Sequence, residues 1–231
     1  MLLSKLNERL QAHGLRTRGA FHPGADDEAP PMKTGRLPAT IVLVGNAGGE
    51  IWPAFSGSPE YRDELPDKMD RWARRVLRDI AAEFNAEADF PFGGPPYRPF
   101  QRWALRADEV WPSPLGLLIH AEFGLWHAYR GAILLPDRIE PPAPSNRVSP
   151  CETCADRPCL KACPVGAFTG NGYDVDACAG HLGSTHGGVC MTGSCLARRV
   201  CPVGRGHRYE PAQSVFHMQA FLHSRHAAGA P

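Results

Sequence analysis

Residues 151–166 read CETCADRPCLKACPVG, and residues 190–204 read CMTGSCLARRVCPVG. Seven of the eight cysteines lie in these two stretches, and the eighth, Cys178, lies between them. Each stretch ends in the same tetrapeptide, Cys-Pro-Val-Gly. Thiolates gathered by short loops, with the last one before a proline, are typical of proteins that hold [4Fe-4S] clusters. The sequence therefore predicts a small iron-sulfur domain in this part of the chain.

The order of the cysteines predicts how they divide between two clusters. In bacterial ferredoxins with two clusters, the cysteine before the proline binds the other cluster. This rule assigns the first cluster to Cys151, Cys154, Cys159 and Cys201, and the second to Cys163, Cys178, Cys190 and Cys195. Cys163 and Cys201 are then the ligands that cross between the two halves. The gaps before Cys159, Cys195 and Cys201 are wider than in simple ferredoxins, which leaves the type of the second cluster open.

The cysteines could instead form disulfides or bind zinc. Their even number is compatible with disulfides, but residues 1–11 mix charged with apolar residues and lack the apolar core of a secretion signal. Zinc could bind Cys151 and Cys154 with a later pair, although two zinc sites of four cysteines would not require two Cys-Pro endings. Free thiolates in this number need a reducing compartment, so we expect a cytoplasmic protein.

The composition sets limits on the partners of the chain. The 231 residues are 43% hydrophobic and 21% charged, which is ordinary for a globular protein. The net charge of +1 gives no global attraction to nucleic acid or to an anionic membrane. No apolar run approaches the length of about 18 residues that a membrane span needs. We therefore expect no membrane partner.

The first 140 residues predict a mixed α+β domain. Residues 39–44 (ATIVLV) form an unbroken apolar run that predicts a buried strand. Apolar residues recur every three or four positions from Leu65 to Phe84, as expected of an amphipathic helix. The spacing of the leucines near the start predicts an opening helix. Two further strands are predicted over residues 115–119 and 126–135. The prolines and glycines of residues 90–99 predict a loop that could cover a ligand.

Prolines mark the expected boundary between two domains. Five of them interrupt residues 136–150, which predicts a semi-rigid linker. We therefore divide the chain into residues 1–140 and residues 141–231. The second domain would comprise the cysteine segment and a C-terminal tail whose apolar residues, Phe216, Phe221 and Leu222, predict a short helix.

Residues 116–136 read GLLIHAEFGLWHAYRGAILLP. This segment resembles the signature of the CblC-type cobalamin-trafficking and decyanating proteins, whose flavin-reductase-like α/β sandwich holds the corrin with its lower base displaced. The resemblance implies that the first domain binds cobalamin through His120, Phe123, Gly124, Trp126 and Arg130. Glycine would allow close approach to the corrin, the aromatic rings would give apolar contacts, and the arginine would bind an amide or a carboxylate. Since the family binds cobalt without a protein histidine, His120 is not expected to be an axial ligand.

The cysteine segment resembles the two-cluster module that follows a related cobalamin domain in the epoxyqueuosine reductases, an architecture that reductive dehalogenases share. The matching residues are Cys151-Glu-Thr-Cys154, Leu160 to Ala167 and Asp176-Ala-Cys178. No stretch resembles the AGLGWxGKN motif or the acidic catalytic motif of those enzymes, and only about 30 residues follow Cys201. We therefore do not expect tRNA or another nucleic acid as a partner.

These patterns lead to one main hypothesis. A CblC-like α/β sandwich is followed by a small bacterial two-cluster ferredoxin-like module, in an α+β protein. Two [4Fe-4S] clusters, fed by an external electron donor, reduce or dealkylate a cobalamin bound by the first domain. Two further functions remain open, an electron carrier that binds no corrin and a cobalamin chaperone. The sequence identifies no catalytic residue.

Overall fold

The structure, a computed structural model, describes residues 2–143, 147–169 and 172–228, with side chains as far as Arg225. Its contacts divide the chain into two compact units. Unit 1 comprises Met1–Glu109 and His127–Asn146, and unit 2 comprises Val110–Trp126 and Arg147–Pro231. This division differs from the predicted one at residue 140, because residues 110–126 pack with the cysteine segment; the division by function stays a prediction. The predicted linker at residues 136–150 lies partly outside the described residues.

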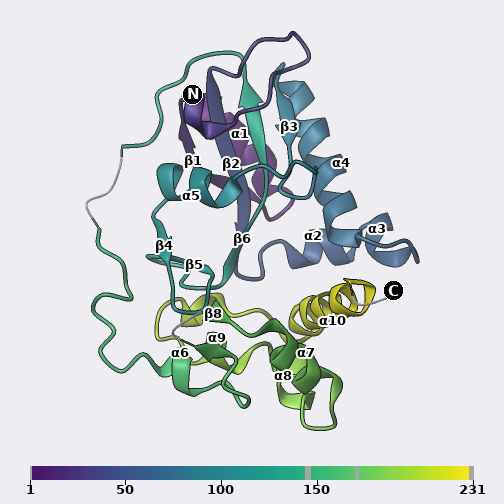
Figure 1. Ribbon diagram of the computed structural model, residues 1–231. Helices are drawn as coiled ribbons and strands as arrows, with labels where there is room; N and C mark the ends of the chain where they lie inside the picture. Colours follow the sequence, from purple (N-terminus) through teal and green to yellow (C-terminus); the bar gives the residue numbers. More distant parts are fainter. Residues whose placement is uncertain (1, 144–146, 170–171, 229–231) are drawn as a thin grey trace. The chain divides into compact units, whose positions relative to one another are not determined.

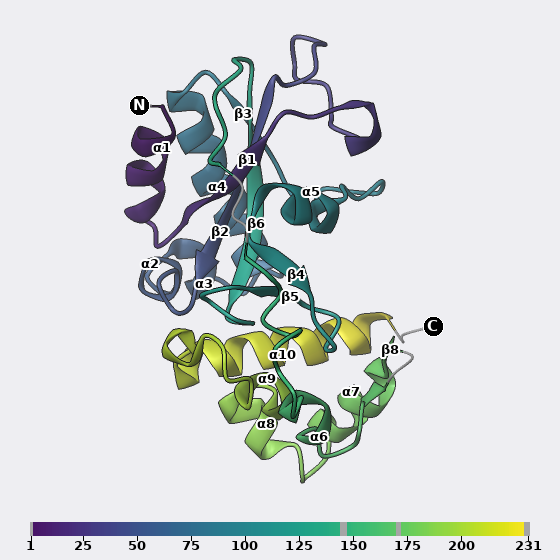
Figure 2. The same ribbon diagram turned by 90° about the vertical axis from the view of Figure 1, so that its left-hand side faces the viewer.

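Unit 1 is built on a four-stranded antiparallel sheet with the order β1-β2-β6-β3. Its strands are β1 (Arg16–Phe21), β2 (Thr40–Ala47), β3 (Glu87–Asp89) and β6 (His127–Leu135). Its helices are α1 (Leu2–Gln11), α2 (Trp52–Ser56), α3 (Pro59–Arg62), α4 (Lys68–Glu83) and α5 (Phe100–Ala107), with a 3-10 helix η1 (Ala25–Asp27). Helices α1 and α4 cover one face of the sheet, and α5 covers the other (Figure 1, Figure 2).

The core of unit 1 lies between β2, β6 and α4. Every residue of β2 is buried, and Trp72, Val76 and Leu77 form part of the buried face of α4. Branched apolar residues fit the pleated surface of a central strand, which explains why β2 forms here. The predicted strand at residues 39–44, the helix over residues 65–84 and the opening helix are confirmed. The sequence did not predict β1, because RTRGAF combines two arginines with a glycine and lacks an apolar alternation.

Unit 2 contains two small hairpins and several short helices. The hairpins pair β4 (Val110–Pro112) with β5 (Leu118–His120), and β7 (Phe168–Thr169) with β8 (Gly172–Tyr173). The helices are α6 (Pro158–Lys161), α7 (Val175–Gly183), α8 (Gly188–Gly193), α9 (Leu196–Arg199) and α10 (Pro211–Ala228), with a 3-10 helix η2 (Arg205–His207). The predicted mixed α/β class is thus observed, and the tail forms a longer helix than predicted. Among the described residues, no helix has the length and apolar character that crossing a membrane requires.

A buried ion pair joins α5 to the sheet of unit 1. Arg18 on β1 and Asp108, directly after α5, lie 2.7 Å apart from Nη2 to Oδ2, and their side chains are only 2% and 10% exposed. Tyr129 on β6 donates a hydrogen bond of 2.7 Å to the same carboxylate oxygen. Burial raises the pKa of Tyr129, so its hydroxyl remains protonated at neutral pH. These three side chains therefore hold β1, β6 and α5 together.

We predict that Asp108→Ala lowers the free energy of unfolding by about 3–5 kcal/mol, because it leaves the buried Arg18 without its counter-charge. Chemical denaturation of the full chain at pH 7 measures this change. Asp26 is exposed, so Asp26→Ala serves as the control and should change the free energy by less than about 0.5 kcal/mol. A similar loss in both variants would contradict the role of the buried pair.

Candidate functional site

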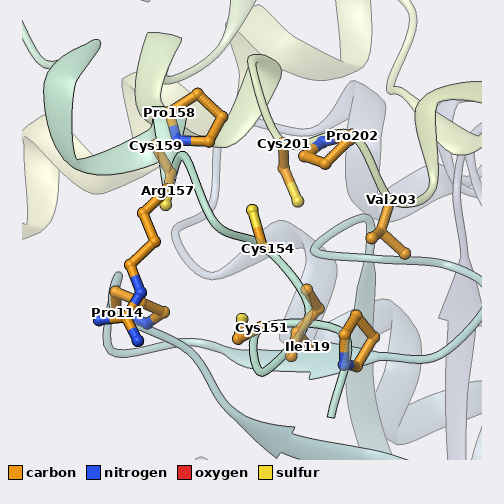
Figure 3. A pocket seen from close by; sticks show the side chains of 11 residues that line it. Pro114, Ile119, Cys151, Cys154, Arg157, Pro158, Cys159, Cys201, Pro202 and Val203 are labelled. Carbon is orange, nitrogen blue, oxygen red and sulfur yellow. The ribbon is translucent and has the colours of Figure 1, made fainter.

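Four cysteines of unit 2 line one cavity, which we call site I. They are Cys151, Cys154, Cys159 and Cys201. Figure 3 shows the sulfur atoms of Cys154 and Cys201 next to one another, with Cys159 to the left of this pair and Cys151 below it. The remaining walls are formed by Pro114, Ile119, Pro150, Arg157, Pro158, Pro202 and Val203. Site I is therefore a largely apolar enclosure with four thiols directed to its interior, which suits a group that binds four thiolates.

Two segments far apart in the sequence assemble site I. Cys151 and Cys154 lie in the loop before α6, Cys159 lies in α6, and Cys201 follows α9. The loop turns sharply at Arg157, whose φ is 39°, and Pro158 then begins α6. Helices α6 and α9 pack on one another. Because of this packing, Cys201 lies beside the other three cysteines of site I, which precede it by some forty residues or more.

The thiols of site I lie in surroundings that disfavour their charged forms. Burial raises the pKa of Cys151, Cys159 and Cys201, and neighbouring cysteines raise the pKa of Cys151 and Cys159 further. The neighbouring backbone N–H groups of Leu160 and Val203 oppose this increase in the pKa of Cys159 and Cys201. A metal group bound here would displace the protons of the four thiols.

The other four cysteines form a second group, site II, which consists of Cys163, Cys178, Cys190 and Cys195. Burial raises the pKa of Cys178 and Cys195, and each is raised further by other members of the group. The backbone N–H of Ala167 donates to Cys163 Sγ at 3.3 Å. The structure places Cys201 with Cys151, Cys154 and Cys159, and Cys163, Cys178, Cys190 and Cys195 lie close enough to act on one another electrostatically. Their division into two sets of cluster ligands stays a prediction. Within the described residues, no three or more His, Cys, Asp or Glu side chains form a group that could hold one metal ion.

His120 and Phe123, two of the five predicted cobalamin contacts, form a turn in unit 2. Their rings stack with centroids 4.2 Å apart. His120 Nδ1 accepts hydrogen bonds from the backbone N–H groups of Glu122 at 3.0 Å and of Phe123 at 3.1 Å. A neutral His120 therefore carries its proton on Nε2, and neither ring nitrogen has a lone pair directed to a metal.

Gly124, a third predicted contact, packs against the loop that follows Cys201. Its φ is +58°, and a Cβ at this position would lie 2.2 Å from the carbonyl oxygen of Val203. Gly204 has a φ of +73°, and a Cβ there would lie 2.2 Å from the carbonyl oxygen of Phe123. Both backbones therefore require glycine at their point of contact. The glycine of the second Cys-Pro-Val-Gly tetrapeptide is explained by this close approach.

Trp126, the fourth predicted contact, is held by Arg198 of α9. The guanidinium carbon of Arg198 lies 4.3 Å from the ring centroid of Trp126 and 4.6 Å from that of Tyr209. It also donates hydrogen bonds of 2.9 Å and 2.6 Å to the carbonyl oxygen of Leu125. Sequence reasoning missed Arg198, because an arginine between two cysteines has no spacing signal that indicates an aromatic partner.

Arg130, the fifth predicted contact, lies in unit 1. Its Nε donates to Asn46 Oδ1 at 3.1 Å, and Asn46 is fully buried. Asp70 in the first turn of α4 is also close, since burial raises the pKa of Asp70 and the charge of Arg130 opposes this increase. Arg130 is therefore positioned by its hydrogen bond to the Asn46 amide oxygen. The structure places it in a different unit from the other four predicted contacts.

We predict that Gly124→Ala destabilises the chain by at least about 2 kcal/mol more than Gly166→Ala. Both glycines have a φ close to +60°, but a Cβ at Gly166 meets nothing within 4 Å. Gly166→Ala should therefore cost only the backbone strain, about 1–2 kcal/mol, whereas Gly124→Ala adds a clash with backbone. Denaturation midpoints and iron content of the two variants measure the difference. Equal losses would show that the contact of residues 123–124 with residues 203–204 is not as close as described.

Comparisons with known proteins show a likeness of fold. No protein-family description and no curated protein matches this chain. Among solved structures, the chain is similar to a selenomethionine-labelled epoxyqueuosine reductase, with a TM-score of 0.53. It is also similar to an epoxyqueuosine reductase with a tRNA-Tyr epoxyqueuosine-modified tRNA stem loop, with a TM-score of 0.49. Each alignment has 16% identity and covers 93% of this chain and 68% of the solved one.

The complex with RNA corrects one expectation. The sequence led us not to expect nucleic acid as a partner, and this is contradicted because an epoxyqueuosine reductase is seen there with a tRNA stem loop. The physical reason is that the net charge describes the whole chain, whereas nucleic acid responds to the local distribution of charge. The alignment with the selenomethionine-labelled enzyme, which covers 93% of this chain, shows that the chain is a mixed α/β protein whose fold is similar to that of epoxyqueuosine reductase.

Proposed function

We propose that this chain is an iron-sulfur protein that delivers electrons from two [4Fe-4S] clusters to a cobalamin bound by unit 1. The observation that carries the proposal is the grouping of the eight cysteines. Site I takes the cysteine before Pro202, and site II takes the cysteine before Pro164, so each site receives its crossing ligand from the other half of the segment. This exchange is the ligand arrangement of two-cluster ferredoxins.

The residues around site I fit a cluster in two ways. Four cysteines line the cavity, and their thiolates would satisfy the ligand number of a [4Fe-4S] cluster. Proline, isoleucine and valine side chains line the rest of the cavity and limit the access of water. When bound, the clusters would supply one-electron transfer. The chain would hold them, tune them through hydrogen bonds and keep them dry.

For cobalamin, we propose Arg130 as the principal contact. A guanidinium that is positioned by Asn46 suits the amides and the phosphate at the edge of this cofactor. The contacts of His120, Phe123 and Gly124 within unit 2 give these three residues a structural role, and a corrin contact for them stays a prediction.

A second candidate is an electron carrier that binds no corrin. The observation that favours it is the packing of residues 120–126 against residues 198–209 of the same unit, which satisfies most of the segment without a ligand. The two candidates share the clusters and differ only in the cobalamin. Experiments on iron and on corrin therefore separate them.

We predict about eight irons per chain after anaerobic purification, as two [4Fe-4S] clusters require. Cys201→Ala should remove the same electron paramagnetic resonance signal as Cys154→Ala, and Cys163→Ala the same signal as Cys178→Ala. Each variant should retain about four irons. If Cys163→Ala instead removed the signal that Cys159→Ala removes, the crossed assignment would be wrong. Zinc in place of iron would overturn the proposal itself.

We predict that hydroxocobalamin added to the anaerobic protein co-migrates with it, and that Arg130→Ala weakens its affinity by about tenfold or more. The loss of one charge-assisted hydrogen bond accounts for this magnitude. Arg62 is an exposed residue at the end of α3, and Arg62→Ala is the control that should bind corrin as the unaltered chain does. The absence of co-migrating cobalt and of any spectral change in the unaltered chain would favour the electron carrier.

A further inference from the structure

One turn of unit 2 holds a serine in a backbone conformation that suits glycine. Ser194 follows α8 and has a φ of 68° and a ψ of 170°. This combination of dihedrals is populated almost only by glycine, because a Cβ atom there lies too close to the backbone. Such a strained residue persists only where the surrounding structure holds it. The conformation of Ser194 is therefore imposed by its neighbours.

The turn at Ser194 connects two cysteines of site II. Cys190 lies in α8, and Cys195 follows Ser194 directly. On the side of Cys190, helix α8 packs on α10. On the other side, Cys195 packs against an apolar cluster that includes Leu125 and the fully buried Ala197. The two ends of the turn are thus anchored separately, and the backbone of Ser194 has to connect them.

A hydrogen bond from α10 holds the strained residue in place. Ser194 Oγ donates to Ser214 Oγ at 2.8 Å. The two serines are only 3% and 2% exposed, so water does not compete for this bond. Ser214 itself is fixed at the start of α10, because its N–H donates to the carbonyl oxygen of Glu210 at 2.9 Å. The first turn of α10 therefore offers a fixed acceptor to the strained turn.

A change of conformation at Ser194 would move one of the two cysteines relative to the other. The dihedrals φ and ψ are the only soft ones of each residue, so a relaxed Ser194 would redirect the peptide group that leads to Cys195. Cys195 would then change its position relative to Cys190. Groups that do not bind a metal themselves often fix the ligands that do.

We propose that Ser214 is a positioning residue for the cluster in site II. Its hydrogen bond keeps Ser194 in the strained conformation in which Cys190 and Cys195 reach the same cluster. This inference rests on the proposed function, because it requires a cluster at that site. Neither serine is a ligand. The four cysteines of site I lie outside this turn, so the effect of Ser214 is confined to site II.

The test measures how fast each cluster of the reduced, anaerobic full chain is lost to an excess of the iron(II) chelator bathophenanthroline disulfonate. The clusters are followed separately, through the electron paramagnetic resonance signals that Cys154→Ala and Cys178→Ala remove. Ser214→Ala should accelerate the loss of the site II signal about tenfold, since one buried hydrogen bond no longer opposes the strain. The loss of the site I signal should keep its rate.

Ser224→Ala is the matched control for this substitution. Ser224 is an exposed serine of the same helix, and its replacement should change neither rate.

Two double variants separate backbone strain from the loss of a hydroxyl group. Glycine adopts the conformation of residue 194 without strain, so Ser194→Gly combined with Ser214→Ala should restore the rate of the unaltered chain to within about twofold. Ser194→Ala combined with Ser214→Ala also removes both hydroxyl groups but keeps the Cβ atom and its strain. This second combination should retain the fast loss of the site II signal.

Each alternative outcome separates this inference from the proposed function. Equal rates for Ser214→Ala and the unaltered chain would overturn the role of Ser214 and leave the two-cluster proposal standing. Faster loss of both signals would overturn it in favour of a general loss of stability. Rescue by Ser194→Ala as complete as by Ser194→Gly would overturn the role of strain. An unaltered chain without clusters would overturn the proposed function and this inference with it.

Discussion

The contact of residues 123–124 with residues 203–204 is the constraint on which unit 2 depends. The two backbones are so close that neither Gly124 nor Gly204 can carry a side chain. This contact holds the loop after Cys201 against the end of the β4–β5 hairpin, and Ile119 of that hairpin forms part of the wall of site I. Arg198 strengthens the same junction through Leu125, Trp126 and Tyr209. The fourth cysteine of site I is therefore positioned by a hairpin that lies some eighty residues earlier in the chain.

The sequence was informative where one local pattern determines one structure. The apolar run at residues 39–44 and the helical periodicity from Leu65 predicted β2 and α4, because burial alone decides both elements. The ferredoxin rule for the cysteine before a proline predicts that Cys201 joins Cys151, Cys154 and Cys159, and these four line one cavity; the ligand assignment itself stays a prediction. The sequence did not reveal β1 or the buried pair of Arg18 with Asp108. Each of these depends on residues that tertiary folding brings together, and neither has a repeating pattern.

A continuous sequence motif does not have to form one surface, as residues 116–136 show. From the sequence, five residues of this segment were expected to contact cobalamin together. In the structure its first half turns back on the cysteine segment, and its second half becomes the central strand β6 of unit 1. Residues 120–126 are explained by contacts within unit 2, whereas Arg130 interacts with Asn46 and Asp70. One continuous motif thus supplies structural contacts to one unit and a candidate binding residue to the other.

Two short helices connect site I with site II. Helix α6 holds Cys159 of site I and leads directly to Cys163 of site II, while α9 begins after Cys195 of site II and leads to Cys201 of site I. A helix rises only about 1.5 Å per residue, and α6 and α9 pack on one another. With clusters in both sites, their separation would be set by these two covalent links and would not respond to movement elsewhere in the chain. Since the rate of electron tunnelling falls steeply with distance, exchange between the two clusters would be constant, and control would be left to the steps by which electrons enter and leave the pair.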